Sequence, residues 1–259
     1  MLAAVSVVGL LAVIGVSSFA DCESHKWGAW TIVTPATRTS DGKRERFCTV
    51  CGAKDEEKIP KRSDPLTDIP DGKWYTAGVL YCYEKRLMNG TAADKFSPNS
   101  LLTRAMFVTV LAAIDKADTS KYTGSSFTDV PTGKWYSKPI EWAYKKGYTS
   151  GVGNGKFGVN DAVTREQLAV FLYNYTEKKG RQVKNLAGLS AFTDAGSVSK
   201  WAVNGVRWAV GNKMISGTSE TLLSPRVAAT RAQVALIVMN YVENILNAPK
   251  DYELPFIPV

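Results

Sequence analysis

The sequence has very little histidine: His25 is the single histidine in 259 residues. A Ser-His-Asp triad, a Cys-His dyad or a histidine-rich metal site would therefore have to use this one side chain. Cysteine is also scarce, and four cysteines are too few for a disulfide-dense scaffold of this length. The remaining composition, with 45% hydrophobic and 22% charged residues, is that of an ordinary globular protein of one or two domains.

Charge is missing from the first twenty residues, which read MLAAVSVVGLLAVIGVSSFA. The stretch ends in small residues, and Ser18 and Ala20 fit a small-x-small cleavage site. We therefore expect residues 1–20 to be a signal peptide, with the mature chain starting at Asp21. The alternative is an uncleaved membrane anchor, although the stretch is short for a span and no Lys or Arg precedes it. No later stretch is long enough to span a bilayer, so we expect a secreted protein without a stable membrane span.

Acidic residues are outnumbered: 24 Asp and Glu stand against 32 Lys and Arg, a formal charge of +8. On a secreted protein this balance points to acidic cell-wall polymers or a membrane surface. A nucleic-acid binder would have the same charge, but the expected secretion argues against it, and we expect no nucleic-acid partner.

An internal repeat dominates the rest of the sequence. Each copy contains an Asp, a Trp six or seven residues later, an Asn or Ser fifteen residues after the Trp, and a Thr-Arg pair whose Thr lies fourteen residues further on. Such spacing in three copies indicates a repeat architecture. The predicted repeats span residues 68–121, 127–180 and 192–246.

Each copy has the pattern of a helix, a loop and a second helix. Apolar residues at helical spacing follow the Trp and again the Thr, and the Thr stands where an N-cap belongs. The caps are Thr103, Thr164 and Thr230, completed as capping boxes by Gln167 and Gln233, whereas the first copy has Met106. Because one such unit cannot bury its apolar faces alone, we predict an all-α assembly with approximate threefold symmetry. An open solenoid is the alternative.

The second copy shows the motifs most clearly: FTDVP at 127–131, GVGNGKF at 151–157 and TREQ at 164–167. These motifs resemble S-layer homology repeats, and the resemblance covers roughly residues 64–246 in the usual set of three. It implies a pseudo-threefold helical spindle. It also implies non-covalent anchoring to secondary cell-wall polysaccharide, often pyruvylated, in grooves between neighbouring repeats.

The same resemblance identifies the arginine after each Thr as the ligand-contacting position. An Arg just inside a helix N-terminus adds a guanidinium fork suited to a carboxylate. The Trp of each copy could offer a flat apolar surface to a sugar ring, and the Asp could accept sugar hydroxyls. The predicted polysaccharide-binding residues are Arg104, Arg165, Arg231, Asp68, Asp129, Asp194, Trp74, Trp135 and Trp201.

These residues also have structural alternatives. The tryptophans could be core residues, the aspartates could cap a helix or a turn, and the arginines could form buried ion pairs with a neighbouring repeat's Asp. The copies depart from the family pattern at Glu166 and Ala202 among others, so we do not expect equal use of the three grooves. Cys82 corresponds to Ala143 and Ala209 in the other copies, which predicts a small buried residue without a chemical role.

Residues 21–60 form a different module, with Cys22-x-x-His25 and Cys48-x-x-Cys51 as two ligand pairs. Four such ligands suit one tetrahedral structural zinc, which would staple a small β-rich segment. The alternative is a disulfide between Cys51 and one of the other two cysteines of the module, which leaves one thiol over unless Cys82 joins. The stretches HKWGAW and CTVCG resemble small Cys/His modules of Gram-positive surface proteins.

Residues 61–67 are predicted to be a linker and residues 247–259 an extended tail. A filled zinc site has no open position for water, and Glu56 and Glu57 lie in a charged run, so we expect no enzymatic activity. The predicted function is wall anchoring at the surface of a bacterium. The alternatives are a surface-attached enzyme or processing factor, or an adaptor whose N-terminal module binds another protein.

Overall fold

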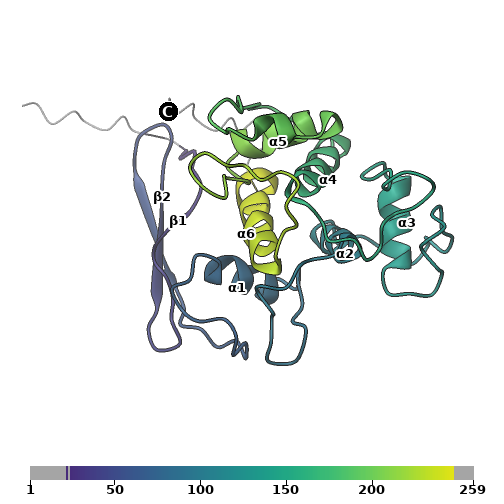
Figure 1. The fold of residues 1–259 in the computed structure, drawn as a ribbon. Coiled ribbons are helices and arrows are strands. Elements are labelled where there is room, and N and C mark those ends of the chain that lie inside the picture. Colours follow the sequence, from purple (N-terminus) through teal and green to yellow (C-terminus); the bar gives the residue numbers. More distant parts are fainter. Residues whose placement is uncertain (1–21, 23, 248–259) are drawn as a thin grey trace, which may run out of the picture.

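A computed structural model describes residue 22 and residues 24–247. The expected signal peptide, and all of the expected tail except its first residue, lie outside these residues. Three β-strands come first and are followed by helices in three pairs (Figure 1). No helix in the described part is long and apolar enough to cross a membrane.

The N-terminal module is a three-stranded antiparallel sheet of order β1-β2-β3. Its strands are β1 (Thr31–Thr34), β2 (Gly42–Phe47) and β3 (Lys54–Ile59). Ion pairs join β2 and β3 on both faces of the sheet: Lys43–Glu56, Arg44–Glu57, Glu45–Lys54 and Arg46–Asp55. Since side chains alternate between the faces of a strand, both faces of this ladder carry charged side chains.

Two tryptophans take the place of a core on one face of the sheet. The guanidinium of Arg46 lies 4.9 Å from the ring of Trp27 and 4.4 Å from that of Trp30. Arg44 lies over Trp30 at 4.6 Å. Each guanidinium also pairs with a carboxylate of β3, so it is held between an aromatic ring and an acid.

The three repeat units each contribute two helices. They are α1 (Thr76–Glu84) and α2 (Arg104–Ile114), α3 (Ser137–Lys145) and α4 (Arg165–Lys178), and α5 (Val203–Gly211) and α6 (Arg231–Tyr241). Short 3-10 turns at Ala195–Ser197 and Lys200–Ala202 precede α5, and a π-helical segment at Val242–Leu246 continues α6.

The second helix of each unit packs against the first helix of the next unit. Thus α2 packs on α3, α4 packs on α5, and α6 returns to pack on α1. Isolated bridges between the segments that precede the second helices follow the same order: Thr103–Ala162, Thr164–Ala228 and Leu101–Thr230. The last unit therefore contacts the first, which excludes an open solenoid.

The expectation of an all-α class is wrong. The described residues combine six α-helices with the three-stranded sheet of the N-terminal module, so the molecule is of mixed α and β structure. The sheet itself is consistent with the β-rich module expected for residues 21–60. Charged residues rather than alternating apolar residues dominate β2 and β3, and cross-strand ion pairs make that pattern stable as a sheet.

Arginines fasten the sheet module to the first repeat unit. Arg62, which is buried, pairs with Asp64 and Asp71 and donates to the carbonyl of Ile69 at 2.8 Å. From the loop before β2, Arg38 donates to the carbonyls of Asp64 and Leu66 at 3.0 and 2.6 Å. The segment predicted as a linker thus carries a buried ion-pair network, which holds the two modules together.

Candidate ligand grooves and metal centre

The threonine caps lie where the sequence predicts them. The hydroxyls of Thr164 and Thr230 accept from the backbone N–H of Gln167 and Gln233, and the side-chain Oε1 of each Gln accepts from the Thr N–H in return, which confirms both capping boxes. Thr103 accepts from Met106 N at 3.3 Å without a reciprocal bond. The caps fix the start of α2, α4 and α6, and each helix begins with the predicted arginine.

Each of these arginines reaches into the next unit of the ring. Arg104 Nε donates to the Phe157 carbonyl at 2.9 Å, and the other two arginines make the same bond. The equivalent bonds are Arg165 to Leu223 at 3.0 Å and Arg231 to Phe96 at 2.8 Å. All three arginine residues are buried, with 3 to 7% of their surface exposed. They therefore form the interfaces between units.

The predicted aspartates hold the same loops from the other side. Asp129 accepts from Phe157 N at 2.7 Å and from Gly158 N at 2.8 Å. The C=O of Phe157 and the N–H of Gly158 belong to one peptide group, so Arg104 and Asp129 bind its two ends. The other copies repeat this with Asp194, Ser224, Leu223 and Arg165, and with Asp68, Ser97, Phe96 and Arg231.

This peptide bridge excludes the ion-pair alternative for the arginines, and their contact with a ligand stays a prediction. The described residues contain no direct ion pair between these arginines and the aspartates, because the peptide group separates them. Asp129 and its equivalents clamp a turn inside their own unit. Whether they also accept sugar hydroxyls stays a prediction.

The terminal nitrogens of the three arginines have different surroundings. Arg165 Nη2 donates to the Ser216 carbonyl and Arg231 Nη2 to that of Asn89. Arg104 Nη2 is buried without a partner. Burial lowers the pKa of all three guanidinium groups, that of Arg104 to about 10, which still leaves Arg104 a cation at neutral pH.

The predicted tryptophans lie on the surface rather than in the core. Trp74, Trp135 and Trp201 are 59 to 61% exposed. A cavity of about 290 Å³ opens beside the first of them, and it is lined by all three units. Its walls include Trp74, Arg165, Ser216, Thr218 and Gln233. A predicted arginine and a predicted tryptophan from different units thus line one groove.

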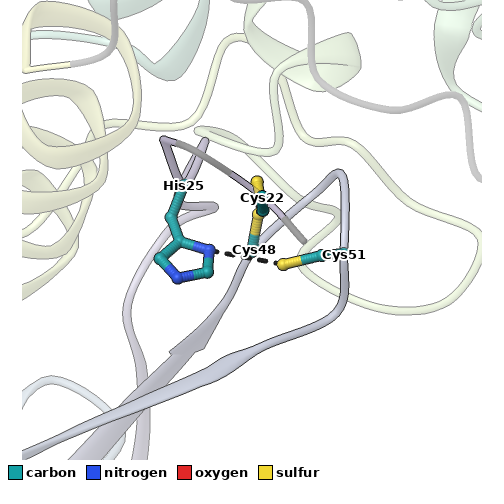
Figure 2. Close-up of side chains that lie close together, drawn as sticks. All are labelled: Cys22, His25, Cys48 and Cys51. Atoms are coloured by element: carbon teal, nitrogen blue, oxygen red, sulfur yellow. Dashed lines mark hydrogen bonds between the residues drawn. The ribbon is translucent and has the colours of Figure 1, made fainter. Parts of the chain in front are cut away.

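The four predicted metal ligands converge at one end of the sheet (Figure 2). Their ligand atoms all lie within 4.8 Å of one another. Cys22 Sγ is 3.9 Å from Cys48 Sγ, and Cys51 Sγ is 3.3 Å from His25 Nδ1. All four cysteines of the chain are free thiols in this structure, so the predicted disulfide alternative does not occur in it. The cluster could hold a metal ion.

The thiols of this cluster differ in their electrostatics. Although burial opposes it, backbone N–H groups of Cys51 and Val50, together with His25, bring the pKa of Cys48 down to about 5. Burial and the neighbouring thiols raise the pKa of Cys22 to about 11. N–H groups that point at Cys48 stabilise its thiolate, which is the form that binds metals.

Cys82 is separate from this cluster, and its predicted burial is confirmed. It is fully buried on α1, facing the carbonyl of Ala235 on α6 at 3.4 Å, and burial raises its pKa to about 12. The equivalent Ala143 and Ala209 are also fully buried.

Sequence reasoning missed three further contacts. Glu166 accepts from Ser199 N and Oγ at 2.9 and 2.8 Å and so ties α4 to the third unit. The other two are the Arg62 network and the stacking of Arg44 and Arg46 on the tryptophans of the sheet. The departure of Glu166 from the family pattern was the one available signal.

Comparison with known proteins gives a consistent result. A family model described as the S-layer homology domain matches residues 65–106, 126–169 and 191–235. The chain is 29% identical over 73% of its length to the exoglucanase XynX of Acetivibrio thermocellus. It is 36% identical over 42% of its length to a cell surface protein of Thermoanaerobacter kivui, and 28% identical over 63% to the surface-layer 125 kDa protein of Lysinibacillus sphaericus. It spans only 14 to 17% of the length of these relatives.

Proposed function

Since the chain belongs to the S-layer homology domain family, we propose that it anchors non-covalently to the bacterial cell wall. The matches to surface-layer and cell-surface proteins place it at the cell surface or cell wall. The observation that carries the proposal is the ring of three units joined by arginines at their interfaces. An excess of positive charge, +8 overall, favours an anionic wall polymer as the target.

The proposed ligand is a secondary cell-wall polysaccharide that carries carboxylates such as pyruvate ketals. The cavity beside Trp74 supports this choice, because it combines an exposed indole with a buried cation and hydroxyl groups. The indole offers a stacking surface for a sugar ring, and Arg165 supplies positive potential for a carboxylate. Ser216, Thr218 and Gln233 line the same cavity with polar groups.

For the N-terminal module we propose one structural zinc ion, held by Cys22, His25, Cys48 and Cys51. Three thiols and one imidazole are a donor set that zinc prefers, and a tetrahedral site has S···S edges of about 3.8 Å. The 3.9 Å between Cys22 and Cys48 supports this assignment. Four protein ligands would leave zinc no open position for water, so its contribution is to hold the ends of the sheet together.

We propose that the chain itself has no enzymatic activity. Its one histidine and three of its four cysteines belong to the metal cluster, and the fourth cysteine is buried on α1. A surface-attached enzyme or processing factor, and an adaptor whose N-terminal module binds another protein, remain the alternatives. Turnover of a wall substrate by the purified chain would support the first of them.

The test is co-sedimentation of the purified chain with cell-wall sacculi, half of them stripped of secondary polysaccharide with acid. We expect binding to the intact sacculi and loss of binding to the stripped ones. Equal binding to both would mean that peptidoglycan or charge alone is the target, and binding to neither would reject the anchor.

Two substitutions locate the binding site within the molecule. Trp74→Ala removes an exposed ring, so we expect weaker binding with unchanged unfolding temperature. Arg165→Ala should weaken binding and also destabilise the fold, because Leu223 and Ser216 lose their donor. Leu186→Ala, at an exposed residue outside both the groove and the sheet, is the control. Unchanged binding by Trp74→Ala would place the ligand outside this groove.

A further inference from the structure

The two edges of the sheet are protected very differently. The outer strand β3 is charged at five of its six positions, KDEEK followed by Ile59. The other outer strand, β1, has the sequence TIVT, without charge, and all four residues are exposed. Natural sheets protect free edges with charge because unpaired N–H and C=O groups recruit further strands. β1 is therefore the unprotected edge.

The side chains of β1 also favour pairing of this edge with a further strand. Ile32 is 40% exposed and Val33 is 49% exposed. Among the described residues only β2 pairs with β1, so the opposite edge of β1 has no strand partner. β-branched residues favour strand pairing, and these four side chains are all β-branched.

We propose that β1 of one copy pairs antiparallel with β1 of a second copy. A twofold axis between Ile32 and Val33 would place Ile32 of each copy opposite Val33 of the other, and Thr31 opposite Thr34. The sequence TIVT is self-complementary in this register, since aliphatic residues face each other and hydroxyl residues face each other. The absence of charge in β1 means that no like charges meet, although the chain as a whole carries +8.

The contact is limited in size and therefore weak. The register of β1 on β2 shifts between Ile32 and Thr34, and Pro35, which has no N–H, follows the strand. Four residues bury far less surface than a standard stable interface of about 1,600 Å². On the wall, confinement to one surface would raise the effective concentration of the copies, a consequence that rests on the proposed anchoring.

The test is sedimentation of the full chain, without any wall material, from about 10 μM to about 1 mM, the range of weak association. We expect the mass to rise from that of a monomer toward that of a dimer with concentration. Ile32→Lys would place a charge opposite an aliphatic side chain in both halves of the contact, so we expect it to remain a monomer. Val33→Lys is a second variant of the same edge in case the first one folds poorly.

Leu186→Lys is the matched control, because Leu186 is an aliphatic residue with 42% exposure outside the sheet. It should dimerise like the unmodified chain. A chain that stays monomeric at every concentration would overturn the proposal, and so would dimerisation that survives both β1 variants. Because the measurement is made in solution, its outcome is independent of whether the chain binds sacculi.

Discussion

The peptide group between Phe157 and Gly158 shows how an interface arginine, Arg104, can be both structural and charged. Arg104 binds its carbonyl and Asp129 its N–H, so the cation is fixed in position without being neutralised by a direct contact. A buried cation without an ion-pair partner keeps its positive potential, which under the proposed function would favour an anionic ligand.

The repetition of residues identified this arrangement only in part. It marked the arginines, aspartates and cap threonines, and all of them lie at the unit interfaces or their loops. It could not show that the Arg and the Asp bind the two ends of one peptide group, because the residue that supplies the N–H differs among the copies. Ser97, Gly158 and Ser224 all have positive φ, between 53° and 77°, yet only one of them is a glycine.

The aspartate clamps should make the fold sensitive to acid. Burial opposes ionisation of Asp129, but the N–H groups of Phe157 and Gly158 lower its pKa below the usual value, and backbone N–H groups do the same for Asp194. A lowered pKa in the folded state means a contribution that is complete above the unfolded pKa of about 3.9 and is lost as pH falls below it. We expect the unfolding temperature, measured from neutral pH down to about pH 2.5, to fall in that acid range.

Asp129→Asn tests the origin of this acid sensitivity. An amide accepts at one atom only, so one N–H of the loop loses its acceptor, at a cost of about 1 to 3 kcal/mol at neutral pH. The variant should also show a smaller drop in acid. Glu220→Gln, in an exposed loop, should match the unmodified chain at every pH. A full acid transition in Asp129→Asn would assign the sensitivity to other groups.

Among the elements, the sequence predicted the first residue of a helix more accurately than its last residue. The Thr caps place the first residues of α2, α4 and α6. The apolar pattern of the first helix runs on to Leu87, but α1 ends at Glu84. There Arg86 takes a positive φ of 54°, and the N–H groups of Leu87 and Met88 both turn back to the Cys82 carbonyl. Arginine gives no signal for such a turn, which glycine usually marks.

The proposed zinc ion should stabilise the sheet more than the helices. The strands of the sheet exchange ion pairs on both faces, and exposed ion pairs contribute little to stability. We therefore expect removal of the metal by a chelator to unfold residues 24–59 while the three helical units keep their structure. Hydrogen exchange followed by mass spectrometry would show this as loss of protection confined to the three strands of the sheet.

A pair of cysteine variants distinguishes the effect of losing the metal from the effect of losing any one thiol. Cys51→Ser should lower metal content and protection of the sheet together, whereas Cys82→Ala, at a buried thiol of α1, should leave metal content unchanged. Full protection of the sheet in a protein shown by elemental analysis to be free of metal would contradict a structural role.

At the scale of the whole molecule, the sequence predicted three units but not how they join. Apolar stripes on both helices of a unit indicated burial without naming a partner, and the partner of each second helix is the first helix of the following unit. The groove is a consequence of this packing between neighbouring units. Trp74 comes from the first unit, Arg165 from the second and Ser216 from the third, so the cavity exists only when the ring is closed.

Closure depends on the contact of α1 with α6, and Gly78 lies in this contact. A Cβ at this position would lie 2.7 Å from Leu236 Cα and 2.8 Å from Leu236 N, and backbone atoms cannot move aside. Alanine favours a helix by about 1 kcal/mol over glycine, so an isolated helix would gain from Gly78→Ala. In the closed ring we expect the opposite, a loss of about 1 to 3 kcal/mol from overpacking, measured by chemical unfolding.

Because the same contact completes the groove, Gly78→Ala should also bind sacculi less well, although Gly78 does not line the cavity. Gly205→Ala makes a milder clash between α5 and α4, because its Cβ would lie 2.9 Å from the side-chain Cγ2 of Val170 and 3.1 Å from its Cα. It tests whether another interface of the ring has the same effect to a smaller degree. Gly188→Ala, where a Cβ meets nothing within 4 Å, should change neither stability nor binding. If Gly78→Ala were as stable as the Gly188 control, the first and last units would not be held together in solution, and a groove that requires all three units could not be the binding site.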